Sequence, residues 1–475
     1  MGRLNKVKVN IIQRVFLTRL QSDIIKKTRH PRQCCPPYTL KYIQALLLRD
    51  DFEVKLLDCR IKQPAFSELI EASLSWEPEL LVIEADFLCY DDAIKYADTI
   101  KKEKNILIIL ISQVSEYIND NRNCVFDLVF CGEAEEQVVA VIKKNNQGEN
   151  VYKEKSTFSG RKEVLLVDRL NVLPFPRYEL TEFEEYRLSY PIQISEKVIW
   201  GHMLSTRGCA HKCIFCAPFN RYSFGKRVRF RSSVNIVDEM EGLIKHGVNV
   251  ISFDDDDFTF YPKHVISVCN EIQKRNLRIS WIAHARVDEV DFDLLKIMRK
   301  AGCILLRLGI ESGSKRILDI LEKNPLRIDW IEKSKAVFKA TRELDIATVA
   351  LFIIGNPTET KKDLRASIQL AKDLDPDLIQ IHFFTPYIGS IAYDRFKLQI
   401  GSLDDSNKLK MYHYSNPQVK LSGFSLDDLS KIRTFFYRAV LLKPKFIFRH
   451  LKHYLMFYLH NFNVLKNVIR IWDIL

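Results

Sequence analysis

Three cysteines, Cys209, Cys213 and Cys216, stand at CxxxCxxC spacing directly after an apolar run, Val198–Leu204. We expect that run to form a strand and the thiols to lie on the loop at its carboxyl end. Three thiolates this close together can each bind one iron of a four-iron, four-sulfur (4Fe–4S) cluster, which leaves the fourth iron open to a substrate or cofactor. A zinc site and three unrelated thiols are the alternatives, but structural zinc normally takes four ligands, and no further Cys or His pair follows at finger spacing.

The loop resembles the signature of the radical S-adenosylmethionine (SAM) enzymes, in which an aromatic residue usually precedes the third cysteine, as Phe215 does here. The resemblance implies that SAM chelates the open iron and that one electron from the cluster cleaves its sulfonium to a 5′-deoxyadenosyl radical. It also implies a reductant such as flavodoxin or ferredoxin. Phe215 would shield the cluster from water, and we expect His211, inside the loop, to be exposed.

The 475 residues are enough for two or three domains of about 100–200 residues each. The composition, 47% hydrophobic and 28% charged, excludes a wholly disordered chain. A net charge of +12 suits anionic substrates, a membrane surface or nucleic acid, and it does not choose among them. Eleven cysteines without a repeating framework indicate a reducing compartment. With no signal-peptide pattern and no run of about 18 apolar residues, we expect a cytoplasmic protein.

Residues 1–150 alternate apolar runs with segments of helical periodicity, a pattern that predicts a doubly wound parallel α/β sheet. The expected strands are Val7–Ile12, Phe52–Leu57, Leu80–Ile83, Ile106–Ile111 and Phe126–Phe130. The expected helices are Tyr38–Arg49, Ala65–Ser75, Asp91–Lys102 and Glu135–Lys144. Such sheets bind ligands at the carboxyl ends of their strands, and the absence of GxGxxG argues against a dinucleotide.

This first segment resembles the Rossmann-like cobalamin-binding domain found in one branch of the radical SAM enzymes. The supporting residues are Pro36–Leu40, Asp58 and the Gly132-Glu133 pair. Cobalamin proteins that ligate cobalt through histidine carry DxHxxG, whereas Asp58 is followed here by Cys-Arg-Ile-Lys-Gln. The radical branch often lacks that histidine, so cobalamin remains an expected cofactor. A domain of this shape that holds no corrinoid is the alternative.

Residues 151–196 are predicted to be a proline-punctuated connector, and the strand–helix alternation restarts over residues 197–400. Six strands are expected there: Val198–Leu204, Val248–Phe253, Ile279–Ala283, Ile304–Leu308, Thr348–Ile354 and Leu378–Phe383. They fit the partial (β/α)6, TIM-like barrel that the resemblance implies. Barrels of this kind place their chemistry on loops at the carboxyl ends of the strands.

Four residues that the resemblance implies as SAM contacts lie on those loops. Asp254 and Asp255 open an acidic run after the second strand, where the family contacts the amino group of the methionine moiety. Arg286 follows the third strand, where an arginine can pair with a carboxylate through two hydrogen bonds. Glu311 follows the fourth strand and matches the family's ribose-contacting motif, since a carboxylate accepts from hydroxyls.

Smaller residues complete the expected cofactor site. Ser312 and Gly313 belong to the motif that contains Glu311, and Gly313 would allow close backbone approach. Gly355 opens the turn after the fifth strand, which passes near adenine in the family. Thr358 stands in that turn where the family usually has glycine, and a β-branched residue disfavours positive φ.

Residues 401–475 are predicted to be helical, and from Lys443 onward they are basic and aromatic. A basic amphipathic tail can lie on an anionic membrane, here the inner face, and would suit a lipid-like substrate. Packing of the tail over the barrel is the alternative. No feature indicates a nucleic-acid partner.

The combined motifs indicate an enzyme that cleaves SAM reductively and, with cobalamin, methylates an unactivated carbon of a small molecule. A radical cyclase or rearrangement enzyme without methyl transfer is a second interpretation. A methylthiotransferase acting on transfer RNA would need a second cluster, for which the other cysteines offer no convincing set. A non-catalytic iron–sulfur or corrinoid-binding protein is the remaining alternative.

Overall fold

The structure is a computed structural model, and it describes residues 14–20, 35–86, 89–112, 125–149, 151, 165–179, 182–188, 190, 197–216, 224–400, 417 and 419–442. The chain divides into two compact units. Unit 1 comprises Met1–Gln21, Pro37–Val167 and Leu173–Arg177, and unit 2 comprises Ser22–Pro36, Asp168–Val172 and Tyr178–Leu475. The described parts of the expected connector are therefore shared between the two units.

Unit 1 is built on a parallel sheet in the order β2-β1-β3-β4-β5. Its strands are β1 (Arg14–Arg19), β2 (Glu53–Asp58), β3 (Leu80–Ala85), β4 (Leu107–Ser112) and β5 (Leu128–Cys131). Every residue of β3 and β4 is buried, which explains why both appear in the sequence as continuous apolar runs. The predicted doubly wound sheet is confirmed. The expected strand Val7–Ile12 lies outside the described residues, and β1 begins at Arg14 instead.

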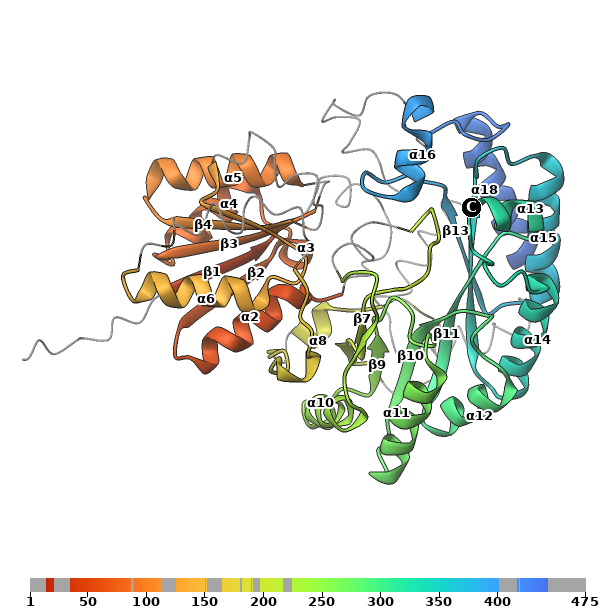
Figure 1. Cartoon of the computed structure of the whole chain (residues 1–475), viewed down its shortest axis with the longest axis horizontal. Helices are drawn as coiled ribbons and strands as arrows, with labels where there is room; N and C mark the ends of the chain where they lie inside the picture. The colour runs from red at the N-terminus through yellow and green to blue at the C-terminus, as the bar shows by residue number, and fades with distance from the viewer. Residues whose placement is uncertain are drawn as a thin grey trace, which may run out of the picture. The chain divides into compact units, whose positions relative to one another are not determined.

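Helices cover both faces of this sheet (Figure 1). Helices α2 (Tyr38–Arg49) and α6 (Glu135–Asn146) pack together on one face. Helices α4 (Phe66–Leu74) and α5 (Tyr90–Glu103) pack together on the other, and the short α3 (Cys59–Lys62) follows β2. The predicted helices are thus in place, with ends shifted by no more than a few residues.

Unit 2 contains a parallel sheet in the order β13-β12-β11-β10-β9-β6, which is the chain order reversed. The strands are β6 (Trp200–Met203), β9 (Val250–Phe253), β10 (Ser280–Ala285), β11 (Cys303–Glu311), β12 (Ala347–Ile354) and β13 (Leu378–Phe383). A small antiparallel pair, β7 (Thr206–Arg207) and β8 (Arg229–Phe230), flanks the cysteine loop. Because each strand pairs with the next one in the chain, consecutive carboxyl ends are neighbours. The predicted partial barrel is confirmed.

The helices of unit 2 are α8 (Glu182–Glu185), α10 (Ser233–Lys245), α11 (Pro262–Lys274), α12 (Phe292–Lys300), α13 (Lys315–Ile320), α14 (Trp330–Glu343), α15 (Lys361–Leu374), α16 (Ile391–Ile400) and α18 (Leu426–Leu441). Among them, α11, α12, α14 and α15 line the outer side of the curved sheet (Figure 1). Side-chain caps fix where several begin. Ser232 accepts from the backbone of α10, Asp291 from that of α12, and Thr360 forms a capping box at α15.

Helix α18 confirms the helical C-terminal region as far as it is described. It packs on the last strands, with the rings of Phe352 and Phe436 5.3 Å apart and the hydroxyl of Tyr437 accepting from the backbone of Ile381 at 3.0 Å. The basic, aromatic residues 443–475 lie outside the described residues, so membrane contact through them remains a prediction. No helix in the described ranges is both long enough and apolar enough to cross a bilayer.

Candidate functional site

The cysteine loop is anchored to the barrel between its second and third thiols. Of the three cysteines on this loop, Cys213 is buried, and Cys209 and Cys216 are partly exposed. The backbone N–H of Ile214 donates to the carbonyl of Leu321 at 3.1 Å, and the Ile214 side chain is fully buried. Phe215 packs against the same apolar cluster as Ile214. The loop therefore presents three thiols from a backbone that is held in place.

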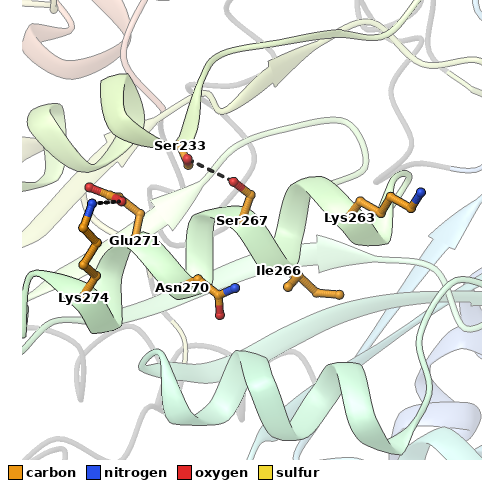
Figure 2. Close-up of a pocket in the computed structure, with 7 residues that line it drawn as sticks. All are labelled: Ser233, Lys263, Ile266, Ser267, Asn270, Glu271 and Lys274. Atoms are coloured by element: carbon orange, nitrogen blue, oxygen red, sulfur yellow. Dashed lines mark hydrogen bonds and ion pairs between the residues drawn. The ribbon is translucent and has the colours of Figure 1, made fainter.

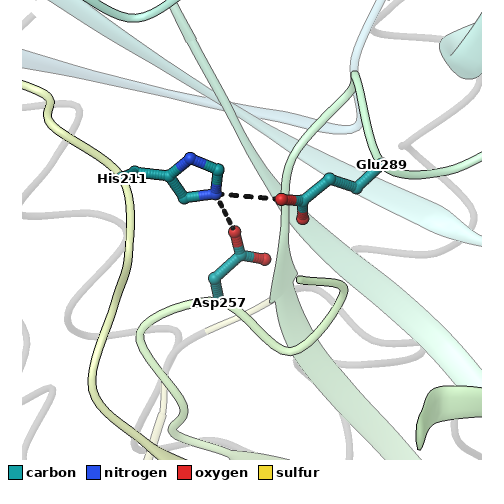
Figure 3. A group of neighbouring side chains, drawn as sticks. All are labelled: His211, Asp257 and Glu289. Carbon is teal, nitrogen blue, oxygen red and sulfur yellow. Dashed lines mark hydrogen bonds and ion pairs between the residues drawn. The ribbon is translucent and has the colours of Figure 1, made fainter. Parts of the chain in front are cut away.

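His211 fixes the other half of this loop (Figure 3). Its Nε2 lies 3.1 Å from an Asp257 carboxylate oxygen and 2.9 Å from a Glu289 oxygen. The Thr259 hydroxyl lies 3.0 Å from the second oxygen of each carboxylate. Burial lowers the pKa of His211, but the two carboxylates outweigh burial and raise it above its usual value. The side chain is only 17% exposed, so the expectation of an exposed histidine is wrong.

Arg286 lies in the site but already has a carboxylate partner. Its Nε and Nη2 donate to the two oxygens of Asp288 at 3.0 and 2.8 Å, and Nη2 also donates to the carbonyl of Lys323 at 2.8 Å. The remaining terminal nitrogen, Nη1, lies 3.7 Å from the sulfur of Cys213. We expected the guanidinium of Arg286 to hold an external carboxylate through two hydrogen bonds. Two of its nitrogens, the fork formed by Nε and Nη2, are instead bound to Asp288.

Asp254 and Asp255 follow β9 as expected, yet both are committed to internal contacts. Asp254 accepts from His202 Nδ1 at 2.7 Å and lies 3.7 Å from Arg307 Nη2; despite its burial, these charges hold the pKa of Asp254 well below its usual range. Asp255 accepts from the backbone N–H and hydroxyl groups of Ser205 and Thr206. Burial raises the pKa of Asp255 to about 6. Both acids hold the β6 and β9 strand ends together.

Asp256, which the sequence analysis did not select, is the acid with unused bonding capacity. Its Oδ2 is buried and has no hydrogen-bond partner among the described residues. Burial and the charges of Asp255 and Asp257 raise the pKa of Asp256 to about 7. A buried carboxylate in this position is stabilised by an incoming cationic or hydrogen-bond-donating group. The adjacent acids gave no signal for which of the four would be left free.

Glu311 ends β11 and forms a buried ion pair that the sequence did not reveal. Its Oε1 lies 3.0 Å from Lys323 Nζ, and both side chains are 8% exposed. Burial lowers the pKa of Lys323, but the charge of Glu311 outweighs burial and raises it overall. Gly309 makes room for the pair, because a Cβ there would lie 2.4 Å from Glu311 Oε1 and 2.8 Å from Lys323 Nζ.

The small residues of the expected site serve packing within unit 2. Ser312 is fully buried, and its hydroxyl lies 3.1 Å from that of Ser367 on α15. A Cβ on Gly313 would lie 2.4 Å from the carbonyl of Ala366, so the close approach is to α15. Gly355 has φ +77° and faces Leu429 of α18, which a Cβ would approach to 3.0 Å. These contacts position the strand ends.

At the carboxyl edge of unit 1, ion pairs occupy the segment that DxHxxG would form. Arg19 at the end of β1 makes a two-point, buried contact with Asp58 at the end of β2. Arg60, at the position of the motif's histidine, lies 2.8 Å from an Asp86 oxygen. The sequence of unit 1 contains no histidine at all. In this sheet the strand order reverses between β1 and β3, the topological switch point. Doubly wound sheets bind ligands at the carboxyl ends of the strands beside that point.

A shallow groove on the outer surface lies apart from these residues (Figure 2). It has a volume of about 350 Å³ and runs between α10 and α11, where the hydroxyls of Ser233 and Ser267 are 3.0 Å apart. Lys263 and Lys274 also line it, but none of the strand-end residues described above does. The candidate cluster and SAM contacts therefore lie at the strand ends and not in this groove.

Residues 203–371 match the model of the Radical SAM superfamily. The match begins in β6 and ends within α15, so it contains the cysteine loop and the carboxyl ends of β9 to β12.

Two curated relatives extend the comparison. An uncharacterized methyltransferase, PH0819, of Pyrococcus horikoshii is 28% identical over 448 residues, 92% of this chain and 93% of that protein. An anaerobic magnesium-protoporphyrin IX monomethyl ester cyclase of Cereibacter sphaeroides is 31% identical over 228 residues, 47% of this chain and only 36% of that protein.

A solved structure matches both units. The radical SAM methyltransferase TsrM of Kitasatospora setae, with cobalamin and a 4Fe–4S cluster bound, has a TM-score of 0.64 and covers 83% of this chain and 76% of its own. At 16% identity, this likeness shows the fold. The expected α/β architecture, a Rossmann-like sheet followed by a partial barrel, is therefore confirmed.

Proposed function

We propose that this chain, whose residues 203–371 match the model of the Radical SAM superfamily, cleaves SAM reductively and methylates an unactivated carbon of a small molecule with the help of cobalamin. The observation that carries the proposal is the anchored loop that brings together three cysteines, Cys209, Cys213 and Cys216. The full-length similarity to a protein named as a methyltransferase favours the methyl-transfer outcome.

The donor set fits a 4Fe–4S cluster with one open iron. Three thiols lie on one loop, and the nearby imidazole of His211 already has its Nε2 directed at Asp257 and Glu289. When bound, the cluster would supply the electron that cleaves SAM, and cobalamin would supply the methyl group. The protein's part is to hold the loop, bury the site and orient the substrate.

Three side chains are the candidates to hold SAM. Asp256, with its unpartnered carboxylate oxygen, is suited to the ammonium of the methionine moiety. Lys323 is a buried cation that pairs with Glu311 within the described residues, and its charge suits the SAM carboxylate. Glu311 pairs with Lys323 through Oε1, and we assign its second carboxylate oxygen to the ribose hydroxyls. This assignment replaces Asp254 and Asp255 with Asp256.

Replacing Asp256 with asparagine is expected to weaken SAM binding by about 10- to 100-fold, because a hydrogen bond to a charged group is worth about 1.5–3 kcal/mol. Calorimetric titration of the cluster-containing protein with SAM measures the change. Asp255→Asn is the matched comparison, since its carboxylate is already used by Ser205 and Thr206. It should lower stability but leave the SAM affinity of the folded protein nearly unchanged. The reverse pattern would contradict the assignment.

Cobalamin fits unit 1 only without a histidine ligand from that unit. The sheet order and the switch point between β1 and β3 support a ligand at the carboxyl edge. Since unit 1 has no histidine, and Arg60 stands where the DxHxxG motif has one, none of its side chains can ligate cobalt through imidazole. The unit would contribute shape and backbone contacts instead.

Product analysis separates methyl transfer from the cyclase alternative, which the similarity to a protein named as a protoporphyrin ester cyclase over 47% of this chain leaves to be tested. With cobalamin, a reductant and an accepted substrate, methyl transfer predicts both 5′-deoxyadenosine and S-adenosylhomocysteine, the second arising when SAM restores the methyl group. A cyclase predicts 5′-deoxyadenosine without S-adenosylhomocysteine. Omitting cobalamin should remove the second product in the first case and change nothing in the other.

A further inference from the structure

Arg286 approaches a cysteine of the cluster loop from inside the barrel. Its side chain is 6% exposed, and Nη1 lies 3.7 Å from the sulfur of Cys213, within the reach of an N–H···S hydrogen bond. Cys213 is itself among the buried residues. No solvent layer therefore separates the guanidinium from the thiol.

The surroundings of Arg286 leave it little freedom to turn elsewhere. Asp288 accepts from two of its nitrogens and the carbonyl of Lys323 accepts from one, while the centre of the guanidinium lies 5.5 Å from the ring of Trp330. The backbone N–H of Arg286 also donates to Thr259 at 3.1 Å. Because these contacts fix the fork, Nη1 is held toward Cys213 without further ordering.

We propose that Arg286 is a positioning residue that donates a hydrogen bond to the Cys213 thiolate and thereby raises the reduction potential of the bound cluster. The proposal rests on the proposed function, since it needs a cluster at Cys213. It assigns Arg286 a role different from that of an arginine that binds the SAM carboxylate, for which Asp288 has taken the fork.

The direction of the effect follows from charge. Reduction adds an electron to the cluster, and part of the added negative charge resides on the thiolate sulfurs. A donor aimed at one sulfur, in a site from which water is excluded, stabilises the reduced form more than the oxidised form. Because Asp288 pairs with Arg286, it offsets the positive charge that the cluster would experience from the arginine. The hydrogen bond from Nη1 is therefore the main contribution of Arg286 to the reduction potential. Removing it should make the cluster harder to reduce.

Spectroelectrochemical titration of anaerobically purified, cluster-containing protein tests the proposal. The variant Arg286→Met/Asp288→Asn removes the donor without leaving a buried carboxylate unpaired, and Arg286→Lys keeps the charge but loses the fork. Arg275→Met is the control, since Arg275 pairs with Asp238 and Glu271 on the outer helices. Iron and sulfide are quantified in every sample before the titration.

The proposal predicts a midpoint potential that is more negative than wild type in the double variant, a smaller negative shift in Arg286→Lys, and none in Arg275→Met. An unchanged midpoint in a double variant with full cluster content would overturn it. If the double variant fails to retain a cluster, an unchanged midpoint in cluster-containing Arg286→Lys overturns it equally. A wild-type protein that assembles no 4Fe–4S cluster would instead refute the proposed function.

Discussion

Replacing Cys213 with alanine is expected to give a folded protein that neither retains a 4Fe–4S cluster nor cleaves SAM. Cys213 is the buried thiol of the loop, with Arg286 3.7 Å from its sulfur. Mutating a residue that hydrogen-bonds to a metal ligand typically lowers metal affinity or activity by about 10- to 100-fold. Removing a ligand itself should therefore reduce 5′-deoxyadenosine formation by more than about 100-fold. Iron and sulfide content, together with chromatography of the nucleoside product, measure both effects.

Cys269→Ala is the matched control for that variant. Cys269 is fully buried in the apolar core on α11 and lies outside the cysteine loop. Its replacement should cost some stability through a small cavity but leave cluster content and product formation intact. Undiminished SAM cleavage by Cys213→Ala would remove Cys213 from the site.

Replacing Lys323 with methionine is expected to lower the free energy of unfolding of unit 2 by about 3–5 kcal/mol, because it leaves Glu311 as an uncompensated buried charge. The pair is 3.0 Å apart with both side chains 8% exposed, so solvent cannot take over the role of Lys323. Urea denaturation followed by fluorescence measures the loss. SAM cleavage should fall as well, because Lys323 and Glu311 are both candidates to hold SAM.

The double variant Lys323→Met/Glu311→Leu separates these two effects. Replacing both charges with apolar groups should restore most of the stability, since a buried ion pair contributes little relative to an apolar pair of similar volume. SAM binding should stay lost. Lys335→Met is a control on an exposed pair, with side chains 39% and 66% exposed, and should leave the stability nearly unchanged. Recovery of SAM binding in the double variant would show that the pair serves stability alone.

The architecture was largely predictable because burial imposes periodicity on the sequence. Strands β3 and β4, buried on both faces, appear as uninterrupted apolar runs, and the expected Leu378–Phe383 coincides with β13. The sequence did not predict β1 (Arg14–Arg19), because the neighbouring run Val7–Ile12, which lies outside the described residues, is more apolar. Pattern alone cannot rank two adjacent candidates for one strand.

The residues around the cysteine loop were less predictable, because their roles depend on pairing across the barrel. In the run Asp254–Asp257, the residue types are identical, and only packing shows that three acids have internal partners while an oxygen of Asp256 does not. Lys323 lies in a turn after α13, with no periodic signal to connect it to Glu311. His211 gave no sign of its two carboxylate partners.

Thr358 shows a local preference overridden by its surroundings. Threonine disfavours positive φ, yet Thr358 has φ +59°, in the left-handed region. Arg316 donates to its hydroxyl at 2.8 Å and to its carbonyl at 3.0 Å, and these bonds hold the turn. The substitution therefore leaves the turn after β12 in its left-handed form, which the residue type alone did not predict.

The measurement that tests the central claim most directly is SAM turnover by the wild-type chain, purified without oxygen and supplied with iron, sulfide and a strong reductant. We predict about four irons per chain and reductant-dependent formation of 5′-deoxyadenosine. A protein that holds this cluster and binds SAM, yet forms no 5′-deoxyadenosine with or without cobalamin, would contradict the account and favour a non-catalytic iron–sulfur protein.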